Sequence, residues 1–415
     1  MKRIMYLLVL ILCNGNFYLL GITTGSDTGA FTLSGSITYP GGASTISGLV
    51  FMTSGFALTN ATTNLTWHSY FPCQGPITMN GGTITINRGD FVLYGNATLV
   101  NGGTFACNGY SVQFPNDNTP FSPGSTPSTF NGGNASFNSP VALSTTLTFQ
   151  GACILNGNGN VITFASAAAI SVASGGSLLI KNATLQGVAG TQLSCVDNTA
   201  ALSLQNVTII QDGNSTFNQG ILNILNDVVV TGSTVFAFRS TNSLNINSFS
   251  TLFFDLGSTF SYDTTNASLI KFADASAQLF LHGATLSATG TGVNLINGTL
   301  NIDQNSFFSS TGTLGISIGN CATDCTLNML PNGQLTVNQG SLSYRNLNAA
   351  SFNMFNSFAQ LSMGANTTLN VYKNLTGQGS VIFGNNTTLG TAPGVSLAIS
   401  SLQQGAISFT TLPFC

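Results

Sequence analysis

The segment Ile154–Phe164, Ile-Leu-Asn-Gly-Asn-Gly-Asn-Val-Ile-Thr-Phe, consists of two short apolar runs separated by an Asn-Gly turn. Similar runs of Ile, Leu, Val or Phe alternate with small polar residues along most of the chain, as in residues 83–87 and 244–247. Alternation with a period of two is the pattern of a half-buried β-strand, and Gly or Asn at the end of each run indicates a turn. Since no segment has the periodicity of an amphipathic helix, the sequence predicts an all-β protein.

The apolar runs recur along the chain at a nearly constant spacing between their centres. These centres are Leu204, Ile224, Ile246, Ile270, Leu295, Ile316 and Val337. The spacing indicates a solenoid, because a propeller blade needs about 40–45 residues. We therefore expect coils of about 20–25 residues, roughly fifteen or more of them, in which each strand pairs with its equivalent one turn above. The competing architecture is a pair of antiparallel β-sandwich domains.

Three segments resemble consecutive coils of the right-handed parallel β-helix proteins, the pectate-lyase-like superfamily. These segments are residues 147–149, 154–164 and 178–185, and the resemblance covers mainly residues 140 to 400. The superfamily includes polysaccharide lyases and hydrolases, and also the passenger regions of bacterial surface adhesins of the autotransporter type. The resemblance implies a right-handed parallel β-helix (β-solenoid), but it says little about activity, because one fold hosts many functions.

The N-terminal segment has the pattern of an export signal. Lys2 and Arg3 precede the apolar run Ile4–Leu12, and small polar residues follow. We assign residues 1–21 to a signal peptide whose end lies between 15 and 25, which predicts an extracellular or cell-surface protein without a transmembrane span in the mature chain. An uncleaved anchor and lipidation at Cys13 are the alternatives.

The rest of the chain is predicted to have two parts. Residues 136–415 form the parallel β-helix. Residues 22–135 are β-rich but less regular and contain a Pro-rich loop at 115–127. This N-terminal region is a cap, a separate β-sandwich or a set of further coils, and the sequence alone leaves these alternatives open. A cap is attractive because the first coil of a solenoid has an unpaired edge.

The composition restricts the function. Only 5% of the 415 residues are charged, none is Glu, and the net charge is −3. A chain with so few basic residues has no electrostatic footprint for nucleic acid. Its 43% hydrophobic residues, which include 30 Phe, are enough for a large core.

The sequence contains no convincing catalytic or metal-binding motif. Glycoside hydrolysis needs two carboxylates about 5–10 Å apart, but Asp212, Asp227, Asp255 and Asp274 are spaced so that no pair clearly stacks in successive coils. The two histidines, His68 and His282, have no Gly-x-Ser-x-Gly motif. The sequence therefore predicts no enzyme, no cofactor and no metal site; a β-helix polysaccharide lyase or hydrolase is the alternative.

Three smaller motifs remain. Arg88-Gly89-Asp90 stands between two strand-like runs, where it could be an adhesive turn or an ordinary solvated turn. Cys321 and Cys325 are close enough in sequence for a local disulfide; we favour a disulfide or two buried thiols over zinc, because no His lies nearby and no second Cys-x-x-Cys follows. About a dozen Asn-x-Ser/Thr sequons occur, as expected by chance in a chain rich in Asn, Ser and Thr.

These observations predict an exported, surface-associated structural or adhesive protein. Its partner is expected to be a glycan or a protein that binds along the flank of a rigid solenoid. Neutral hydroxyl and amide side chains on that flank supply hydrogen bonds.

Overall fold

A computed structural model describes most residues from 126 onward and mainly the strands before it. The described residues are 12–13, 16–17, 30–39, 43–47, 49–61, 64–68, 77–80, 83–86, 90–93, 97–99, 103–114, 121–123, 126–348, 351–403 and 405–414. Side chains are described at 405–414 and, except for 97–99 and 121–123, from 83 to 401 within these ranges. The chain is 61% strand, and its strands form parallel stacked coils of about 13 turns. The prediction of an all-β parallel β-solenoid is therefore confirmed. In the described residues we find no apolar helix of membrane-spanning length.

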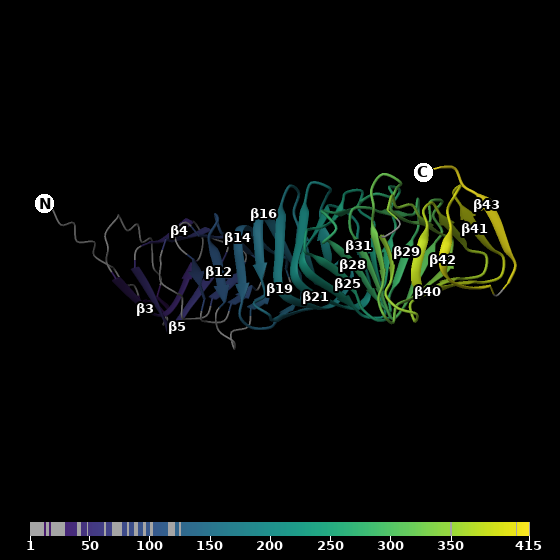
Figure 1. The fold of residues 1–415 in the computed structure, drawn as a ribbon. Helices are drawn as coiled ribbons and strands as arrows, with labels where there is room; N and C mark the ends of the chain where they lie inside the picture. Colours follow the sequence, from purple (N-terminus) through teal and green to yellow (C-terminus); the bar gives the residue numbers. More distant parts are fainter. Residues whose placement is uncertain are drawn as a thin grey trace. The chain divides into compact units, whose positions relative to one another are not determined.

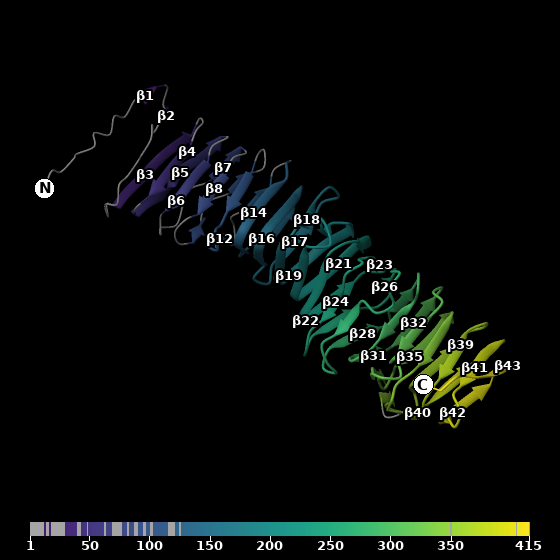
Figure 2. The same cartoon turned by 90° about the horizontal axis from the view of Figure 1, so that it is seen from above.

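The chain divides into two compact units, Met1–Leu178 and Leu179–Cys415. Figures 1 and 2 show the strands of each unit stacked side by side. In the first unit, β1 (Leu12–Cys13) and β2 (Asn16–Phe17) form an antiparallel pair. One parallel column follows: β3 (Ala30–Tyr39), β5 (Leu49–Ala61), β7 (Ile77–Asn80), β10 (Ala97–Leu99) and β13 (Phe121–Pro123).

A second parallel column of the first unit contributes part of its described core. It consists of β4 (Ala43–Ser47), β6 (Asn64–His68), β8 (Thr83–Ile86), β11 (Gly103–Ala106), β14 (Ser128–Phe137), β16 (Thr146–Asn156) and β18 (Ala169–Val172). The later halves of β14 and β16 continue a third column that starts with β9 (Phe91–Val92) and β12 (Ser111–Phe114), and β15 (Val141–Leu143) pairs with β17 (Val161–Phe164). Phe105, Phe130 and Phe149 occupy equivalent positions of successive coils, and their rings stack at 5.3 and 5.4 Å.

The second unit starts within β19 (Ser177–Gly190) and has three strands in most coils. The long strands β21 (Ala201–Phe217) and β22 (Ile221–Thr231) follow β20 (Leu193–Cys195). One ladder, called the β25–β37 ladder below, consists of β25 (Thr251–Phe254), β28 (Gln278–His282), β31 (Thr299–Asp303), β34 (Thr326–Met329) and β37 (Phe352–Met354).

Two further columns complete these coils. The six-stranded sheet contains β30 (Val293–Leu295), β33 (Ile316–Ile318), β36 (Ser341–Tyr344), β39 (Thr368–Val371), β41 (Thr387–Thr391) and β43 (Ile407–Thr411), while β24 (Leu244–Ile246) pairs with β22 and with β27 (Ile270–Phe272). The last column contains β23 (Val235–Phe238), β26 (Thr259–Tyr262), β29 (Thr285–Ala288), β32 (Asn305–Ser310), β35 (Gln334–Gln339), β38 (Gln360–Met363), β40 (Leu375–Phe383) and β42 (Leu397–Gln403).

Alternate residues of each strand point into the solenoid and stack in columns. Leu252, Leu279, Leu300 and Leu327 are register partners in successive coils, and each is at most 2% exposed. Complete burial of one leucine side chain stabilises the fold by about 1.5–3 kcal/mol. Along each strand, the residues next to these leucines point outward. The alternation therefore also decides which side chains can contact a ligand.

The described part of residues 22–135 consists mainly of strands. The described strands from β3 to β13 pair in parallel with one another and lie in further coils. The expected boundary at 135/136 falls inside the continuous strand β14, and the Pro-rich segment 115–127 is not only a loop, because it contains β13.

The number of turns is smaller than the fifteen or more expected. The reason is that some coils of the second unit are longer than expected, although the last coils, as between Leu389 and Phe409, are short again. Leu204 pairs with Ile224 in the next coil, and Phe308 pairs with Val337. The sequence separation is larger in the second pair than in the first. Longer coils use more residues per turn, so the same chain makes fewer turns.

The predicted column of apolar centres is only partly right. Leu204, Ile224 and Ile246 are register partners, as expected. Ile270, however, is opposite Leu244, two positions from the expected partner, and Val337 belongs to a different column, opposite Phe308. A shift of two positions keeps a side chain on the inward face, so alternation alone does not fix the register.

Candidate functional site

Three aromatic side chains gather on the outward side of the β25–β37 ladder. Phe253 on β25 is the register partner of Phe280 on β28, and their ring centroids lie 4.9 Å apart. His282 follows Phe280 at the next outward position of β28, with its ring centroid 5.9 Å from that of Phe253. All three side chains are half-buried. They therefore present apolar ring surface to solvent from a rigid sheet.

Asp303 orients the imidazole ring of His282. The two residues are register partners on β28 and β31, and His282 Nδ1 lies 3.0 Å from Asp303 Oδ2. Their side chains are 27% and 25% exposed, so the pair is accessible from solvent. When Nδ1–H of the neutral ring donates to the carboxylate, Nε2 is left as a hydrogen-bond acceptor. The pair thus adds a fixed polar group at the edge of the three rings.

A ladder of side-chain amides continues from the aromatic rings along the same outward column. Asn301 is the register partner of Phe280, followed by Asn328 and Asn353 in the next two coils. Asn328 Nδ2 donates to Asn301 Oδ1 at 2.9 Å, and Asn353 Nδ2 donates to Asn328 Oδ1 at 2.8 Å. At the start of the ladder, Asn301 Nδ2 donates to Gln278 Oε1 at 2.8 Å.

Each ladder bond uses one N–H and one lone pair of an amide that has two of each. The half-buried amides of Asn328 and Asn353 therefore keep hydrogen-bonding capacity for a ligand. We call the side chains of Phe253, Phe280, His282, Asp303, Asn301, Asn328 and Asn353 the aromatic–amide strip. Asn301, at 6% exposure, is its buried link between the rings and the half-buried amides. Successive strands are about 4.8 Å apart, so the strip repeats its groups at a fixed interval.

A shorter polar ladder lies on strands β21, β22 and β24. Asn223 Nδ2 donates to Ser203 Oγ at 3.1 Å, and Asn245 Nδ2 donates to Asn223 Oδ1 at 2.8 Å. It has no aromatic neighbour comparable to Phe280 in the next coil, where the register partner of Asn245 is Lys271. The ladder therefore connects coils without forming a similar strip.

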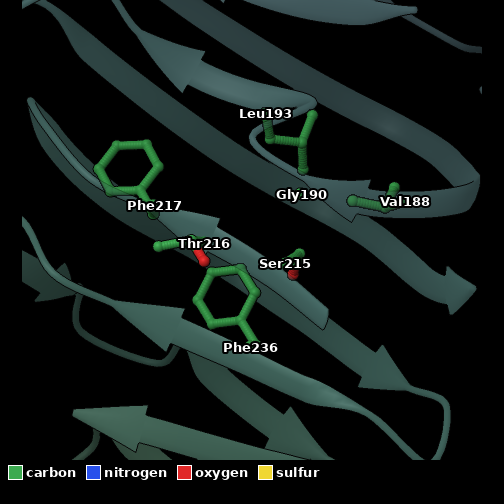
Figure 3. A pocket seen from close by; sticks show the side chains of 7 residues that line it. All are labelled: Val188, Gly190, Leu193, Ser215, Thr216, Phe217 and Phe236. Atoms are coloured by element: carbon green, nitrogen blue, oxygen red, sulfur yellow. The ribbon is translucent and has the colours of Figure 1, made fainter. Parts of the chain in front are cut away.

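A small pocket in the second unit offers no alternative site. Val188, Gly190, Leu193, Ser215, Thr216, Phe217 and Phe236 line it, as Figure 3 shows. Its internal volume of about 10 Å³ accommodates at most one water molecule. A sugar ring or an organic cofactor does not fit there.

Asp90 of the Arg88-Gly89-Asp90 motif is bound to the next coil. Its carboxylate accepts hydrogen bonds from Ser111 N at 3.0 Å and from Gln113 Nε2 at 2.8 Å. Arg88 and Gly89 lie outside the described residues. Asp90 thus connects two successive coils by hydrogen bonds. An adhesive role of the motif stays a prediction.

The expected disulfide between Cys321 and Cys325 is wrong. Cys325 is a free thiol and fully buried, whereas Cys321 is disulfide-bonded. Burial raises the pKa of the Cys325 thiol to about 12, which keeps it protonated and unreactive. The buried amide of Asn346 clamps this turn instead, because it accepts from Cys325 N at 2.9 Å and donates to Cys325 O at 2.7 Å.

The described residues contain no group of three or more His, Cys or Asp side chains arranged to hold a metal ion. Among the same residues Arg239 and Asp263 form an ion pair, while His282 and Asp303 form a hydrogen-bonded pair that is an ion pair only when the imidazole is protonated. Hydrogen bonds from Thr289 and then Arg239 hold the pKa of Asp263 below its ordinary value. These pairs are separate from each other rather than collected in one charged centre.

Sequence reasoning considered His282 only as a candidate catalytic histidine and singled out no other member of the aromatic–amide strip. The signal was present: Phe253 and Phe280 both occupy outward positions of alternating runs, and their separation along the chain is close to one coil. Because coil lengths vary, only the register shows that the two rings touch.

No family model, curated protein or solved structure matches this chain. The resemblance to pectate-lyase-like proteins and surface adhesins thus rests on the residue pattern alone. Of what this resemblance implies, the structure supports the parallel β-solenoid fold.

Proposed function

We propose that this chain is an exported, surface-associated structural or adhesive protein that binds a neutral glycan along the aromatic–amide strip and does not catalyse a reaction on it. The outward cluster of Phe253, Phe280 and His282 beside an amide ladder is the observation that carries the proposal. The apolar C–H faces of pyranose rings pack on aromatic rings, while their hydroxyl groups need donors and acceptors of the amide kind.

The regular spacing of the strip favours a polymer over a small ligand. Asn301, Asn328 and Asn353 are placed on successive strands, about 4.8 Å apart. A glycan chain that runs along the ladder can form weak contacts with several coils at once. Many modest contacts, rather than one deep pocket, then supply the affinity.

The decisive experiment measures binding of purified protein to a panel of neutral polysaccharides by calorimetry. Phe280→Ala is expected to weaken binding by about two- to tenfold, the effect of one lost ring contact. Phe307→Ala is the matched control, since Phe307 is an equally half-buried outward phenylalanine on β32, in another column. Equal loss in both variants, or no binding to any member of the panel, would overturn the proposal.

A second candidate is the polysaccharide lyase or hydrolase of the same fold type. The oriented His282–Asp303 pair favours it, because such pairs act as general bases in enzymes. Incubation of the bound polysaccharides with protein distinguishes the two functions. Release of reducing or unsaturated sugars that disappears in His282→Ala would establish the enzyme; intact polysaccharide supports the binding protein.

Export is a separate part of the proposal. The basic start of the chain and the apolar run that follows it support a cleaved signal peptide. N-terminal sequencing of the mature protein is expected to begin near residue 22, within about residues 15–25. A product that retains Met1 and is found only inside the cell would contradict it.

A further inference from the structure

The coil of the second unit that contains β42 and β43 has an open strand edge. Figures 1 and 2 show β43 next to β41, and β43 pairs with no other described strand. The residue after β43, Leu412, donates from its backbone N to Thr391 O at 2.9 Å. The backbone groups of successive residues point to opposite sides of a strand. The N–H and C=O groups of Phe409 and Thr411 therefore face the open edge.

An apolar column of the core stops at the same edge. Leu342, Leu369 and Leu389 are register partners on successive strands, and each is at most 6% exposed. Phe409 lies opposite Leu389 and continues this column, but its exposed fraction is 74%. Large apolar side chains at inward positions are normally buried. The edge thus lacks both a strand that pairs with β43 and a side chain that covers Phe409.

The sequence of this coil has no feature that protects the edge against pairing. Exposed edge strands of soluble proteins usually carry charged side chains or a proline. Residues 374–414 contain no charged side chain, and β43 contains no proline. Its isoleucine, phenylalanine and threonines favour extended structure. The composition of β43 is therefore that of a strand that pairs on both sides.

A second copy of the same edge fits this surface. Phe409 is the central residue of β43, so a two-fold axis through it pairs the strand with its copy in antiparallel orientation. Phe409 then exchanges N–H···O bonds with its counterpart, and Ile407 lies opposite Thr411. These three residues share the inward face of β43, so the cores of the two copies become continuous. Since neither edge carries a charged side chain, no repulsion opposes the contact.

We propose that the chain forms a two-fold dimer through β43, in which the six-stranded sheets of two copies join into one sheet. The contact uses no residue of the aromatic–amide strip, so it is independent of the proposed glycan binding. The dimer carries one strip in each copy. Attachment of both strips to the same glycan-bearing surface raises the overall affinity without any new contact.

Sedimentation equilibrium of the purified protein tests the proposal, and a particle of two chains that dissociates on dilution is expected. Phe409→Asp is expected to raise the dissociation constant of the dimer at least about a hundredfold, because two unpaired carboxylates would be buried at the axis. Phe358→Asp is the matched control. Phe358 is also 74% exposed, but it lies in the turn between β37 and β38, and its replacement is expected to leave the dimer unchanged.

A second variant tests the backbone contact. Thr411→Pro removes an N–H group of the open edge and none that bonds to β41, so the coil stays folded while pairing with the copy is blocked. This variant is expected to be monomeric, whereas Phe280→Ala is expected to remain dimeric. Circular dichroism confirms that each monomeric variant keeps its strands.

Three results would overturn the proposal. The first is a wild-type protein that stays monomeric at all concentrations, as expected if a different protein covers the edge. The second is a mass that increases beyond two copies, because a two-fold contact closes on itself. The third is the same effect of Phe409→Asp and Phe358→Asp on the dissociation constant.

Discussion

At the scale of single residues, glycine positions provide space for side chains of the neighbouring coil. Gly220 adopts φ +84°, and a Cβ atom there would lie 2.6 Å from Cys195 Sγ. Gly133 has the same relation to Cys107, since a Cβ atom would lie 2.6 Å from Cys107 Cβ. Buried cysteines are thus accommodated where the adjacent coil has no side chain. Burial raises the pKa of the Cys107 and Cys195 thiols to about 12, so they act as small apolar groups.

Gly220→Ala is expected to lower the free energy of unfolding by about 2 kcal/mol or more, because it adds both backbone strain and a steric clash. Gly159→Ala is the matched control: φ is +85° and nothing lies within 4 Å of the added Cβ atom. That variant has only the strain, about 1 kcal/mol. Urea denaturation measures the free energy of unfolding of both variants. Equal decreases in the two variants would show that the Cys195 contact has no effect.

Many sequons are a consequence of how the coils bend. Several sequon asparagines adopt the left-handed conformation, which Asn tolerates better than other non-glycine residues. These are Asn182, Asn206, Asn297, Asn366 and Asn386. The residue after each of them is buried, and a threonine follows. A left-handed Asn, an inward residue and a Thr therefore produce Asn-x-Thr for structural reasons.

At the scale of elements, amide ladders connect successive strands beyond the backbone hydrogen bonds. Asn328 forms ladder bonds with both Asn301 and Asn353. Asn328→Ala removes both bonds and is expected to destabilise the protein by about 1–3 kcal/mol. Asn218→Ala, at an exposed position, is expected to change stability by less than about 0.5 kcal/mol. Thermal unfolding compares the two, and an unchanged midpoint for Asn328→Ala would contradict the role of the ladder.

The ends of three successive strands meet at Asp263. Thr289 Oγ1 donates to Asp263 Oδ1 at 2.6 Å, and Arg239 Nε donates to Asp263 Oδ2 at 2.7 Å. These contacts lower the pKa of Asp263. The resulting stabilisation is complete above the unfolded pKa of about 3.9 and is lost as the pH falls through the folded pKa. Because Arg239 and Asp263 are 53% and 35% exposed, solvent screening keeps the contribution of the ion pair small.

Thr289→Val removes the largest cause of that lowered pKa. The decrease in stability between about pH 6 and pH 2.5 is therefore expected to be smaller in Thr289→Val than in the wild type. Asp263→Asn, which does not titrate, is expected to reduce the decrease further. Urea midpoints measured across this pH range test whether the decrease is largest in the wild type, smaller in Thr289→Val and smallest in Asp263→Asn. The same pH dependence in all three proteins would exclude a role for Asp263.

At the scale of the whole molecule, stability depends on apolar columns and neutral hydrogen bonds. The chain has 5% charged residues, and the described residues contain one partly exposed Arg–Asp ion pair and one partly exposed His–Asp pair. Each exposed pair contributes at most about 1 kcal/mol. The melting temperature is therefore expected to change by less than about 4 °C between roughly 0.02 and 0.5 M NaCl. A decrease larger than this in differential scanning calorimetry would indicate charge contributions that the described ion pairs do not explain.

The sequence by itself determined the class of fold. Alternating runs such as Thr83–Asn87 indicated strands, and Asn-Gly turns separated them at nearly regular intervals. These signals are local, since each depends on a few neighbouring residues and on which face of a strand a side chain takes. They were sufficient to predict parallel stacked coils.

Only the tertiary structure decided which distant side chains touch. Coil length varies along the chain, and a shift of two positions preserves the inward pattern. Phe253 therefore meets Phe280, and Asn346 rather than Cys321 clamps Cys325, through register choices that no local pattern encodes. The candidate site is formed by neighbouring coils, and for that reason the sequence predicted the scaffold but not the residues it brings together.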